Sequence, residues 1–254
     1  MPDLNQNINV YKDRDATGVA AGKAVEACIV NLQKKQDTVR IIFAAAPSQD
    51  AMLNYLTHSD RIEWDRIVAF NMDEYIGLQA DAPERFASYL ENALFSKVNI
   101  KEKHTIQTVN GVAEELDRYE KLLTAAPIDI VCLGIGENGH IAFNDPPVAD
   151  FKDSKMVKVV ELDEPCRLQQ VHDGCFSTFE DVPEKAITLT IPALMSGEHL
   201  FCVVVGENKS TAVKNTMLGP ISTACPASIL REHPSCSFFF DQAAYQQTAH
   251  KENA

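Results

Sequence analysis

Apolar residues along this chain follow two patterns that alternate from one end to the other. The first is a short, nearly continuous apolar run, typical of a strand buried on both faces of a sheet. Such runs occupy residues 39–45, 67–69, 128–133, 186–191, 200–205 and 237–240. The second is an apolar residue every three or four positions, which predicts an amphipathic helix. It occupies residues 15–35, 83–97 and 112–125, and a further helix follows Ser48.

This alternation predicts an α/β fold with a doubly wound, mostly parallel sheet, similar to the Rossmann folds. A chain of 254 residues is long enough for one such domain, and no change in composition marks a boundary within residues 1–254. Residues 148–185 interrupt the pattern because they are polar and show little periodicity. An insertion of this length is more often functional than incidental, so we expect it to serve a site.

The stretch from Ile128 to Pro147, IDIVCLGIGENGHIAFNDPP, carries the densest chemical signal. A predicted strand leads into a loop with three glycines, which permit unusual dihedral angles or the close approach of a ligand. His140 and Asp145 follow within the same loop. Open α/β sheets build their sites in this way, at the carboxyl ends of their strands.

Two other interpretations of this loop have to be weighed. Gly134, Gly136 and Gly139 match the dinucleotide fingerprint G-x-G-x-x-G. That fingerprint requires a helix to begin at the loop, and Pro146-Pro147 would interrupt such a helix, so a nucleotide site is disfavoured. The second alternative is a turn in which the histidine is only a structural residue.

A second stretch, FNMDEYIG at residues 70–77, also follows a predicted strand. Together with GIGENGHIAFNDP it resembles the glucosamine-6-phosphate deaminase family, relatives of the 6-phosphogluconolactonases. The resemblance extends from the first predicted helix to the strand at residues 237–240. It implies a reaction that opens an aminosugar 6-phosphate ring, isomerises the aldose toward the ketose, and releases ammonia and fructose 6-phosphate.

The resemblance also implies catalytic roles for four residues, Asp73, His140, Asn138 and Asp145. Asp73 would be the base that moves a proton between C2 and C1, and Glu74 is expected to support the loop instead. His140 would assist ring opening, because an imidazole can exchange protons near neutral pH. Its helpers in the family are carboxylates, at positions where this chain has Asn138 and Asp145. The family usually has glutamate at the second position, and the amide oxygen of Asn138 can still accept from an imidazole N–H.

The expected substrate contacts depart from the family pattern. The loop after residue 45 is rich in Gly, Ser and Thr in the relatives, whereas here it reads AAAPSQD. Ser48, a plausible N-cap, and Gln49 remain as phosphate candidates, and Lys209 aligns with a phosphate-binding lysine. Residues 148–185 correspond to a mobile lid whose arginine clamps the phosphate about one turn after Arg167. This chain has Val171-His172 at that position. Either Arg167 shifts to contact the phosphate, or His172 replaces the arginine, or the clamp is absent. Gly139 is a further candidate for binding the substrate.

The composition of the chain limits the classes of binding partner that it can have. The net charge of −13 argues against nucleic acid and anionic membrane surfaces. No apolar run reaches the roughly 18 residues of a membrane span, and the first residues carry no signal pattern. The seven cysteines lack C-x-x-C spacing, which favours reduced thiols in the cytoplasm over disulfides or zinc. We therefore expect a small sugar phosphate as partner, with no metal and no cofactor, while a homo-oligomer is left open.

Three classes of function fit these observations. The deaminase–isomerase is favoured, because both long motifs carry it. A non-catalytic sugar-phosphate sensor is suggested by the altered phosphate contacts, although the chain shows no DNA-reading segment or appended domain. A lactonase-type hydrolase of a phosphorylated sugar acid is the third class, and FNMDEY favours the deaminases over it.

Overall fold

The computed structural model describes residues 7–249, apart from the side chain of Asn110. Within these residues, seven strands form one sheet in which all neighbours are parallel. Their order across the sheet is β1 (Asn7–Tyr11), β10 (Cys236–Asp241), β9 (His199–Val204), β6 (Ile130–Leu133), β2 (Val39–Phe43), β3 (Ile67–Asn71) and β5 (Glu102–His104). The predicted α/β class with a mostly parallel sheet is confirmed.

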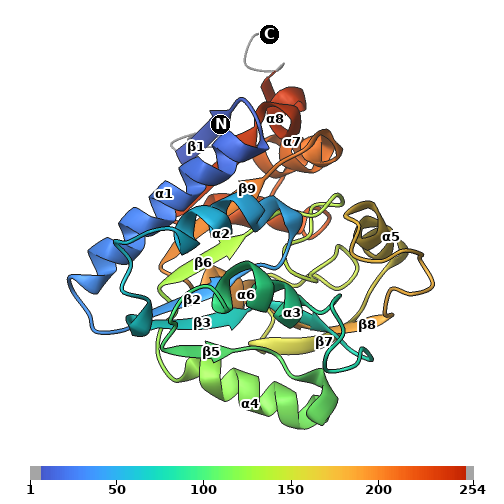
Figure 1. Ribbon diagram of the computed structural model, residues 1–254. Helices are drawn as coiled ribbons and strands as arrows, with labels where there is room; N and C mark the ends of the chain where they lie inside the picture. The colour runs from blue at the N-terminus through green and yellow to red at the C-terminus, as the bar shows by residue number, and fades with distance from the viewer. Residues whose placement is uncertain (1–6, 250–254) are drawn as a thin grey trace.

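Helices cover both faces of this sheet (Figure 1). They are α1 (Arg14–Gln33), α2 (Asp50–Thr57), α3 (Phe86–Leu90), α4 (Val112–Thr124), α5 (Glu164–His172), α6 (Ile191–Met195), α7 (Ser210–Leu218) and α8 (Gln242–Ala249). Successive strand residues point to opposite faces. Ile41 and Phe43 therefore join the core under α1 and α2, while Ile42 joins the core with α4, α6, α7 and α8.

Two helix starts differ from the prediction. The helix expected from Pro83 begins at Phe86, where the buried Glu74 carboxylate accepts from the N–H groups of Phe86 and Ala87. Ser48 is not an N-cap: it lies inside a 3₁₀ turn, Pro47–Gln49, that precedes α2, and neither helical segment has a side-chain cap. The remaining short helical segments are a π-helical turn after α3 (Glu91–Phe95) and 3₁₀ turns at Trp64–Arg66, Thr108–Asn110, Glu207–Lys209 and Pro226–Glu232.

A second, antiparallel sheet lies beside the first. Its order is β4 (Asp73–Tyr75), β8 (Lys185–Leu189) and β7 (Val157–Glu161). Residues 148–185, expected to be irregular, thus contain strand β7 and helix α5. Their pattern is weak because β7 lies at an edge, with Val157 and Val160 buried and Val159 exposed. The edge strands β1 and β5 were missed because neither has a continuous apolar run: β5 is wholly polar, and asparagines alternate with apolar residues at the start of β1.

The carboxyl ends of the central strands meet at one edge of the main sheet. Figure 1 shows α5 beyond this edge, on the side toward which β2, β3 and β6 point. The segments that leave these strands and β9 therefore converge there, and α5 faces them. No helix in the described part of the chain is both long enough and apolar enough to cross a membrane.

Candidate active site

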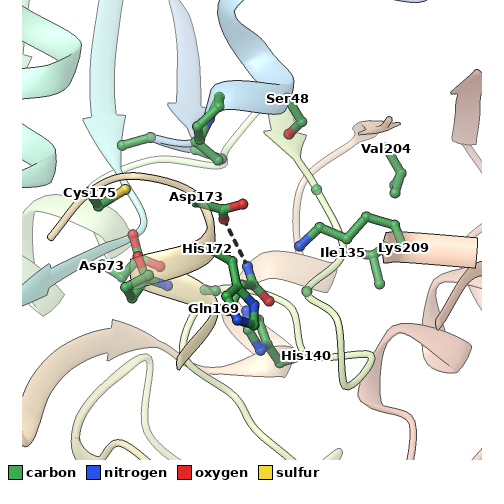
Figure 2. A pocket seen from close by; sticks show the side chains of 18 of the residues that line it. Ser48, Asp73, Ile135, His140, Gln169, His172, Asp173, Cys175, Val204 and Lys209 are labelled. Atoms are coloured by element: carbon green, nitrogen blue, oxygen red, sulfur yellow. Dashed lines mark hydrogen bonds between the residues drawn. The ribbon is translucent and has the colours of Figure 1, made fainter. Parts of the chain in front are cut away.

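A cavity of about 290 Å³ opens at this edge, between the strand ends and α5. Five of the residues predicted from the sequence line it: Ser48, Asp73, His140, His172 and Lys209. Figure 2 shows Asp73 and Lys209 extending from opposite walls, with Asp173 between them. The cavity therefore has an acidic wall and a basic wall.

Asp73 is placed by an abrupt change of sheet. The chain leaves β3 at Asn71 and pairs with β8 from Asp73 onward. The fully buried Asn71 fixes this turn: its Nδ2 donates to the Asp73 carbonyl at 2.9 Å, and its Oδ1 accepts from Ile106 N at 3.0 Å. The Asp73 side chain is thereby held on the cavity wall, with 7% of its surface exposed.

The surroundings of Asp73 suit a base. Burial raises the pKa of its carboxyl well above the usual value, and the negative charges of Glu74 and Asp145 raise it further. Within the described residues, the carboxylate has no hydrogen bond or ion pair to stabilise its charge. A carboxylate in such a site can both take and return a proton at moderate pH.

Glu74 points the other way, as expected from an extended segment. Its carboxylate accepts from Tyr75 N, Phe86 N and Ala87 N at 3.0–3.1 Å, and it lies 3.4 Å from Arg85 Nε. Burial raises its pKa, and these N–H groups and Arg85 work against that rise. Glu74 thus anchors the start of α3 to the loop that carries Asp73.

The loop after β6 forms turns, and the next helix along the chain is α5. This confirms that the glycines do not start a nucleotide-binding helix. Gly136 is needed for another reason: a Cβ there would lie 2.2 Å from the His140 ring. Gly139 has φ +87°, and a Cβ would meet Cys225 Sγ at 2.7 Å. The imidazole therefore lies directly over the loop backbone.

His140 is held by two neighbours on its Nδ1 side. Nδ1 lies 2.8 Å from Asp145 Oδ1 and 2.8 Å from Asn138 Oδ1. Asn138 Oδ1 also accepts from His140 N at 3.0 Å, and its Nδ2 donates to Asp145 Oδ1 at 2.8 Å. Both neighbours offer oxygen acceptors to Nδ1, so the ring proton belongs on Nδ1 and the Nε2 lone pair is left for the cavity. The expected Asn138–His140 hydrogen bond is confirmed.

Asp145 reaches His140 although it is shorter than glutamate. Ala142, with φ 47°, is the one non-glycine residue at positive φ among those described. A bridge between Ile141 and Asn144 closes the same turn directly before Asp145. Burial favours a raised pKa for the Asp145 carboxyl, but His140, Asn138 and the Cys166 thiol together hold this pKa below its ordinary value.

The opposite wall carries Lys209, at the 3₁₀ turn before α7. Its side chain is 7% exposed, and its ammonium has no hydrogen-bond or ion-pair partner within the described chain. Burial lowers the pKa of Lys209, and the nearby negative charges of Asp173 and Glu137 oppose this. Ser48 lines the same cavity. A buried cation without a partner is suited to an anionic group of a ligand.

Not every predicted contact reaches the cavity. Gln49 is fully buried, and its amide faces Ser48 Oγ and the carbonyls of Leu133 and Val203. The Arg167 guanidinium donates to the carbonyls of the segment at residues 179–182, and it is not among the lining residues. Gln49 and Arg167 are therefore structural in this geometry.

Other predicted residues lie next to the cavity or at its border. Gly139, Asn138 and Asp145 stand behind His140 and do not line the cavity themselves. His172 does line it, with 59% of its side chain exposed, and its Nδ1 is 3.5 Å from Glu137 Oε2. His172 thus lies at the border of the cavity, at the place in the chain where the family arginine was expected.

The sequence did not reveal several residues at the cavity. Gln169 and Asn208 line it. Glu137, which is not a lining residue, connects them: its N–H donates to Gln169 Oε1 at 2.7 Å, and its Oε1 accepts from Asn208 Nδ2 at 2.7 Å. Arg14, at the start of α1, also lines the cavity and donates to the carbonyl of Pro47. Asn208 could have been predicted as a lining residue because it precedes Lys209 in the sequence. Arg14 could not, because its position at the start of a helix is not distinctive.

Acid–base groups around one cavity at the carboxyl edge of a parallel sheet define this chain as an α/β protein equipped for proton-transfer chemistry. The model of the family described as glucosamine-6-phosphate isomerases/6-phosphogluconolactonase matches residues 12–238, and the chain belongs to this family. 

Individual relatives agree with this assignment. A glucosamine-6-phosphate deaminase from Listeria welshimeri is 37% identical over 205 residues, covering 79% of this chain and 84% of the relative. One from Thermoanaerobacter pseudethanolicus is 33% identical over 230 residues, covering 87% and 88%.

Solved structures agree as well. A monomeric glucosamine-6-phosphate deaminase superposes with a TM-score of 0.85 at 26% identity, covering 95% of this chain and 99% of that one. A 6-phosphogluconolactonase from Thermotoga maritima has a TM-score of 0.77 at 18% identity, covering 93% and 100%. The latter is a likeness of fold alone.

Proposed function

We propose that this protein is a glucosamine-6-phosphate deaminase, which converts glucosamine 6-phosphate into fructose 6-phosphate and ammonia. The observation that carries the proposal is the arrangement around the cavity: a raised-pKa carboxyl, Asp73, and an oriented imidazole, His140, face the same space as the buried ammonium of Lys209. Curated relatives at 33–37% identity are named for this activity.

Two proton transfers follow from the geometry. His140, with its proton on Nδ1, offers the Nε2 lone pair to the C1 hydroxyl and returns the proton to the ring oxygen, which opens the sugar ring. Asp145 and Asn138 hold the imidazole in this tautomer through their 2.8 Å contacts. Asp73 then takes the proton from C2 and delivers it to C1, which leaves an imine at C2. Water adds to C2 of this imine, and the nitrogen leaves as ammonia while the ketone of fructose 6-phosphate forms.

Lys209 accounts for the phosphate. Its ammonium would pair with the phosphate dianion, with Ser48 and Arg14 as further donors on the same wall. Because Asp73 and Lys209 extend from opposite walls, a sugar bound by its phosphate at Lys209 would present its other end to Asp73 (Figure 2).

The test is ammonia release across a panel of hexosamine 6-phosphates, with fructose 6-phosphate measured in parallel. We expect equal amounts of both products from glucosamine 6-phosphate, and neither from glucosamine. Hydrolysis of 6-phosphogluconolactone in place of ammonia release would identify a lactonase. Tight binding of the sugar phosphate without turnover of either compound would identify a sensor.

The setting of the reaction follows from the thiols. All seven cysteines are free, and five of them are buried. Reduced cysteines in this number are typical of proteins of the cytoplasm, where we expect this enzyme to act on a small-molecule sugar phosphate.

A further inference from the structure

Three side chains of metal-binding type meet behind the His140 ring. They are His140, Asp145 and Cys166, and their ligand atoms all lie within 4.8 Å of one another. The sequence suggested no such group, because Cys166 comes from the first turn of α5 while His140 and Asp145 come from the loop after β6. The exposed fractions of the three residues are 8%, 1% and 0%, respectively.

One carboxylate oxygen in this group lacks a hydrogen bond. Asp145 Oδ1 is satisfied by His140 Nδ1 and Asn138 Nδ2, at 2.8 Å each. Asp145 Oδ2 is buried and forms no hydrogen bond of ordinary geometry with the described residues; the Cys166 thiol, a weak donor, is the further group that stabilises this carboxylate. A buried, ionised oxygen without a strong donor is costly, and it is available to a cation.

We propose that His140, Asp145 and Cys166 form an inhibitory site for a thiophilic divalent cation such as Zn²⁺. Imidazole nitrogen, thiolate sulfur and carboxylate oxygen are the ligands that Zn²⁺ prefers, at about 2.0–2.3 Å. Ligand atoms already within 4.8 Å need only small shifts to surround one ion. Asn138 would remain as the hydrogen-bond donor that orients the ligating carboxylate.

Binding would exchange protons for the ion in a defined way. The Cys166 thiol loses its proton to solvent, and a Zn–S bond forms. The His140 ring keeps one proton, which moves from Nδ1 to Nε2 as Nδ1 becomes a ligand. Asp145 is already ionised, so the charge of Zn²⁺ is balanced by one thiolate and one carboxylate, with water at the fourth position.

The tautomer change makes the ion an inhibitor. In the free protein, Nε2 offers a lone pair to the cavity, whereas with the ion bound it carries the ring proton and can no longer accept one. The ion would also tie α5 to the catalytic loop, because Cys166 belongs to α5. Cys166 is fully buried, so α5 has to separate from the loop for the ion to enter.

Cobalt absorption tests the site independently of any activity. Co²⁺ replaces Zn²⁺ in such sites, and a thiolate ligand adds an intense charge-transfer band in the near ultraviolet. We expect this band to saturate at one ion per chain and to vanish on addition of Zn²⁺. Cys166→Ser and Cys166→Ala should lack the band. Cys175→Ser, the matched control, should keep it, because Cys175 also lies on the lid and lines the cavity but is outside the group.

Inhibition of ammonia release tests the consequence and rests on the proposed function. Zn²⁺ should inhibit the wild type, and EDTA should restore the rate. The half-inhibitory concentration should rise at least about tenfold in both Cys166 variants, each compared with its own metal-free rate, and stay unchanged in Cys175→Ser. A cobalt band that persists in both Cys166 variants, or no band in the wild type, overturns the site. A cobalt band in a protein that releases no ammonia would overturn only the proposed function.

Discussion

The two walls of the cavity are built on opposite principles. The first is the loop after β6 with His140, which we call the catalytic wall after the proposed function. Asn138, His140 and Asp145 contact one another there within 3.0 Å, and backbone constraints at Gly136, Gly139 and Ala142 fix the loop. On the opposite wall, which we call the phosphate wall after the proposed function, Lys209 is buried without a partner in the described chain, and alanines at residues 44–46 line the same cavity.

The difference shows that the catalytic wall orients a side chain, whereas the phosphate wall attracts a charged group of the ligand. An imidazole must present one nitrogen in one tautomer before the substrate arrives, so its partners have to be built into the protein. A phosphate brings its own charge, so the protein needs only to keep a cation unpaired until binding. Asp73 also lacks a partner in the described chain, and its pKa is raised by burial and by the negative charges of Glu74 and Asp145.

The largest effect is expected from Asp73→Asn. The amide keeps the shape of the side chain but cannot take a proton from C2, so turnover should fall by at least about 10²-fold, with substrate binding close to that of the wild type. The measurement is the rate of ammonia release at saturating substrate, together with the dissociation constant of the sugar phosphate.

Asp173→Asn is the matched control, since it removes the same charge from the same cavity. It should leave turnover within a few-fold of the wild type. If both variants lose turnover equally, the charge of the cavity matters and Asp73 has no special role as the base.

Replacing Asp145 tests the catalytic wall, where His140 is already held by hydrogen bonds. Asp145→Ala removes the charged one of the two acceptors at His140 Nδ1, and ring opening should slow by roughly 10²-fold, as expected when a catalytic group is misplaced by about 1 Å. Asp145→Glu should also lower activity, because the aspartate already reaches His140 at 2.8 Å and the longer side chain would press on Cys166.

The rate of anomer interconversion, followed separately from ammonia release, isolates the ring-opening step. A faster Asp145→Glu enzyme would show that the turn at Ala142 has not compensated for the shorter side chain. An unaffected Asp145→Ala enzyme would remove Asp145 from the chemistry.

The sequence predicted the catalytic wall better than the phosphate wall, for a physical reason. Asn138, His140 and Asp145 lie within one loop, so their spacing in sequence already limits their spacing in space. The Asn138–His140 contact could be predicted in this way. The turn at Ala142 could not be predicted, because it depends on a positive φ that an alanine in the sequence does not indicate.

The phosphate wall is assembled from segments far apart in sequence. Arg14, Ser48 and Lys209 come from α1, the turn before α2 and the turn before α7. Whether a side chain from such a segment reaches the cavity depends on the packing of whole elements. The sequence could not show this packing, so Gln49 and Arg167 were plausible phosphate ligands. In the structure, both side chains donate hydrogen bonds to backbone carbonyls instead.

Lys209→Ala tests the phosphate wall, where the ammonium of Lys209 has no partner in the described chain. Binding of the phosphorylated sugar should weaken by about 1.5–3 kcal/mol, the range of a charge-assisted hydrogen bond, while binding of the unphosphorylated sugar should barely change. Lys152→Ala, at an exposed lysine, controls for net charge and should bind both sugars normally. Equal losses for both sugars in Lys209→Ala would make the lysine structural.

The same lysine predicts a dependence on pH. Burial lowers the pKa of Lys209, so its positive charge is lost at a lower pH than that of an ordinary lysine. The affinity of the wild type for the phosphorylated sugar should therefore fall as the pH rises through this lowered pKa. Titrations of binding against pH should show this fall in the wild type and not in Lys209→Ala.

The smallest effect is on stability, and it follows from the raised pKa of Asp73. The folded protein binds the Asp73 proton more tightly than the unfolded chain does, so ionisation of Asp73 favours unfolding. This destabilisation is absent below the unfolded pKa of about 3.9 and complete above the raised pKa of the folded state.

Asp73→Asn removes the charge and should therefore be more stable than the wild type at neutral pH, by roughly 1–2 kcal/mol, while catalysing far less. For a chain of this size, 1 kcal/mol corresponds to about 2–4 °C in Tm. The gain should shrink as the pH is lowered toward the unfolded pKa, where the wild-type carboxyl is also neutral in both states. Asp81→Asn, at an exposed carboxylate, should show no gain at either pH. Thermal melts of the three proteins from neutral to acidic pH make the comparison. A variant at Asp73 that is less stable at neutral pH would mean that the carboxylate is stabilised in the folded protein, and that its place on the cavity wall is maintained by its charge.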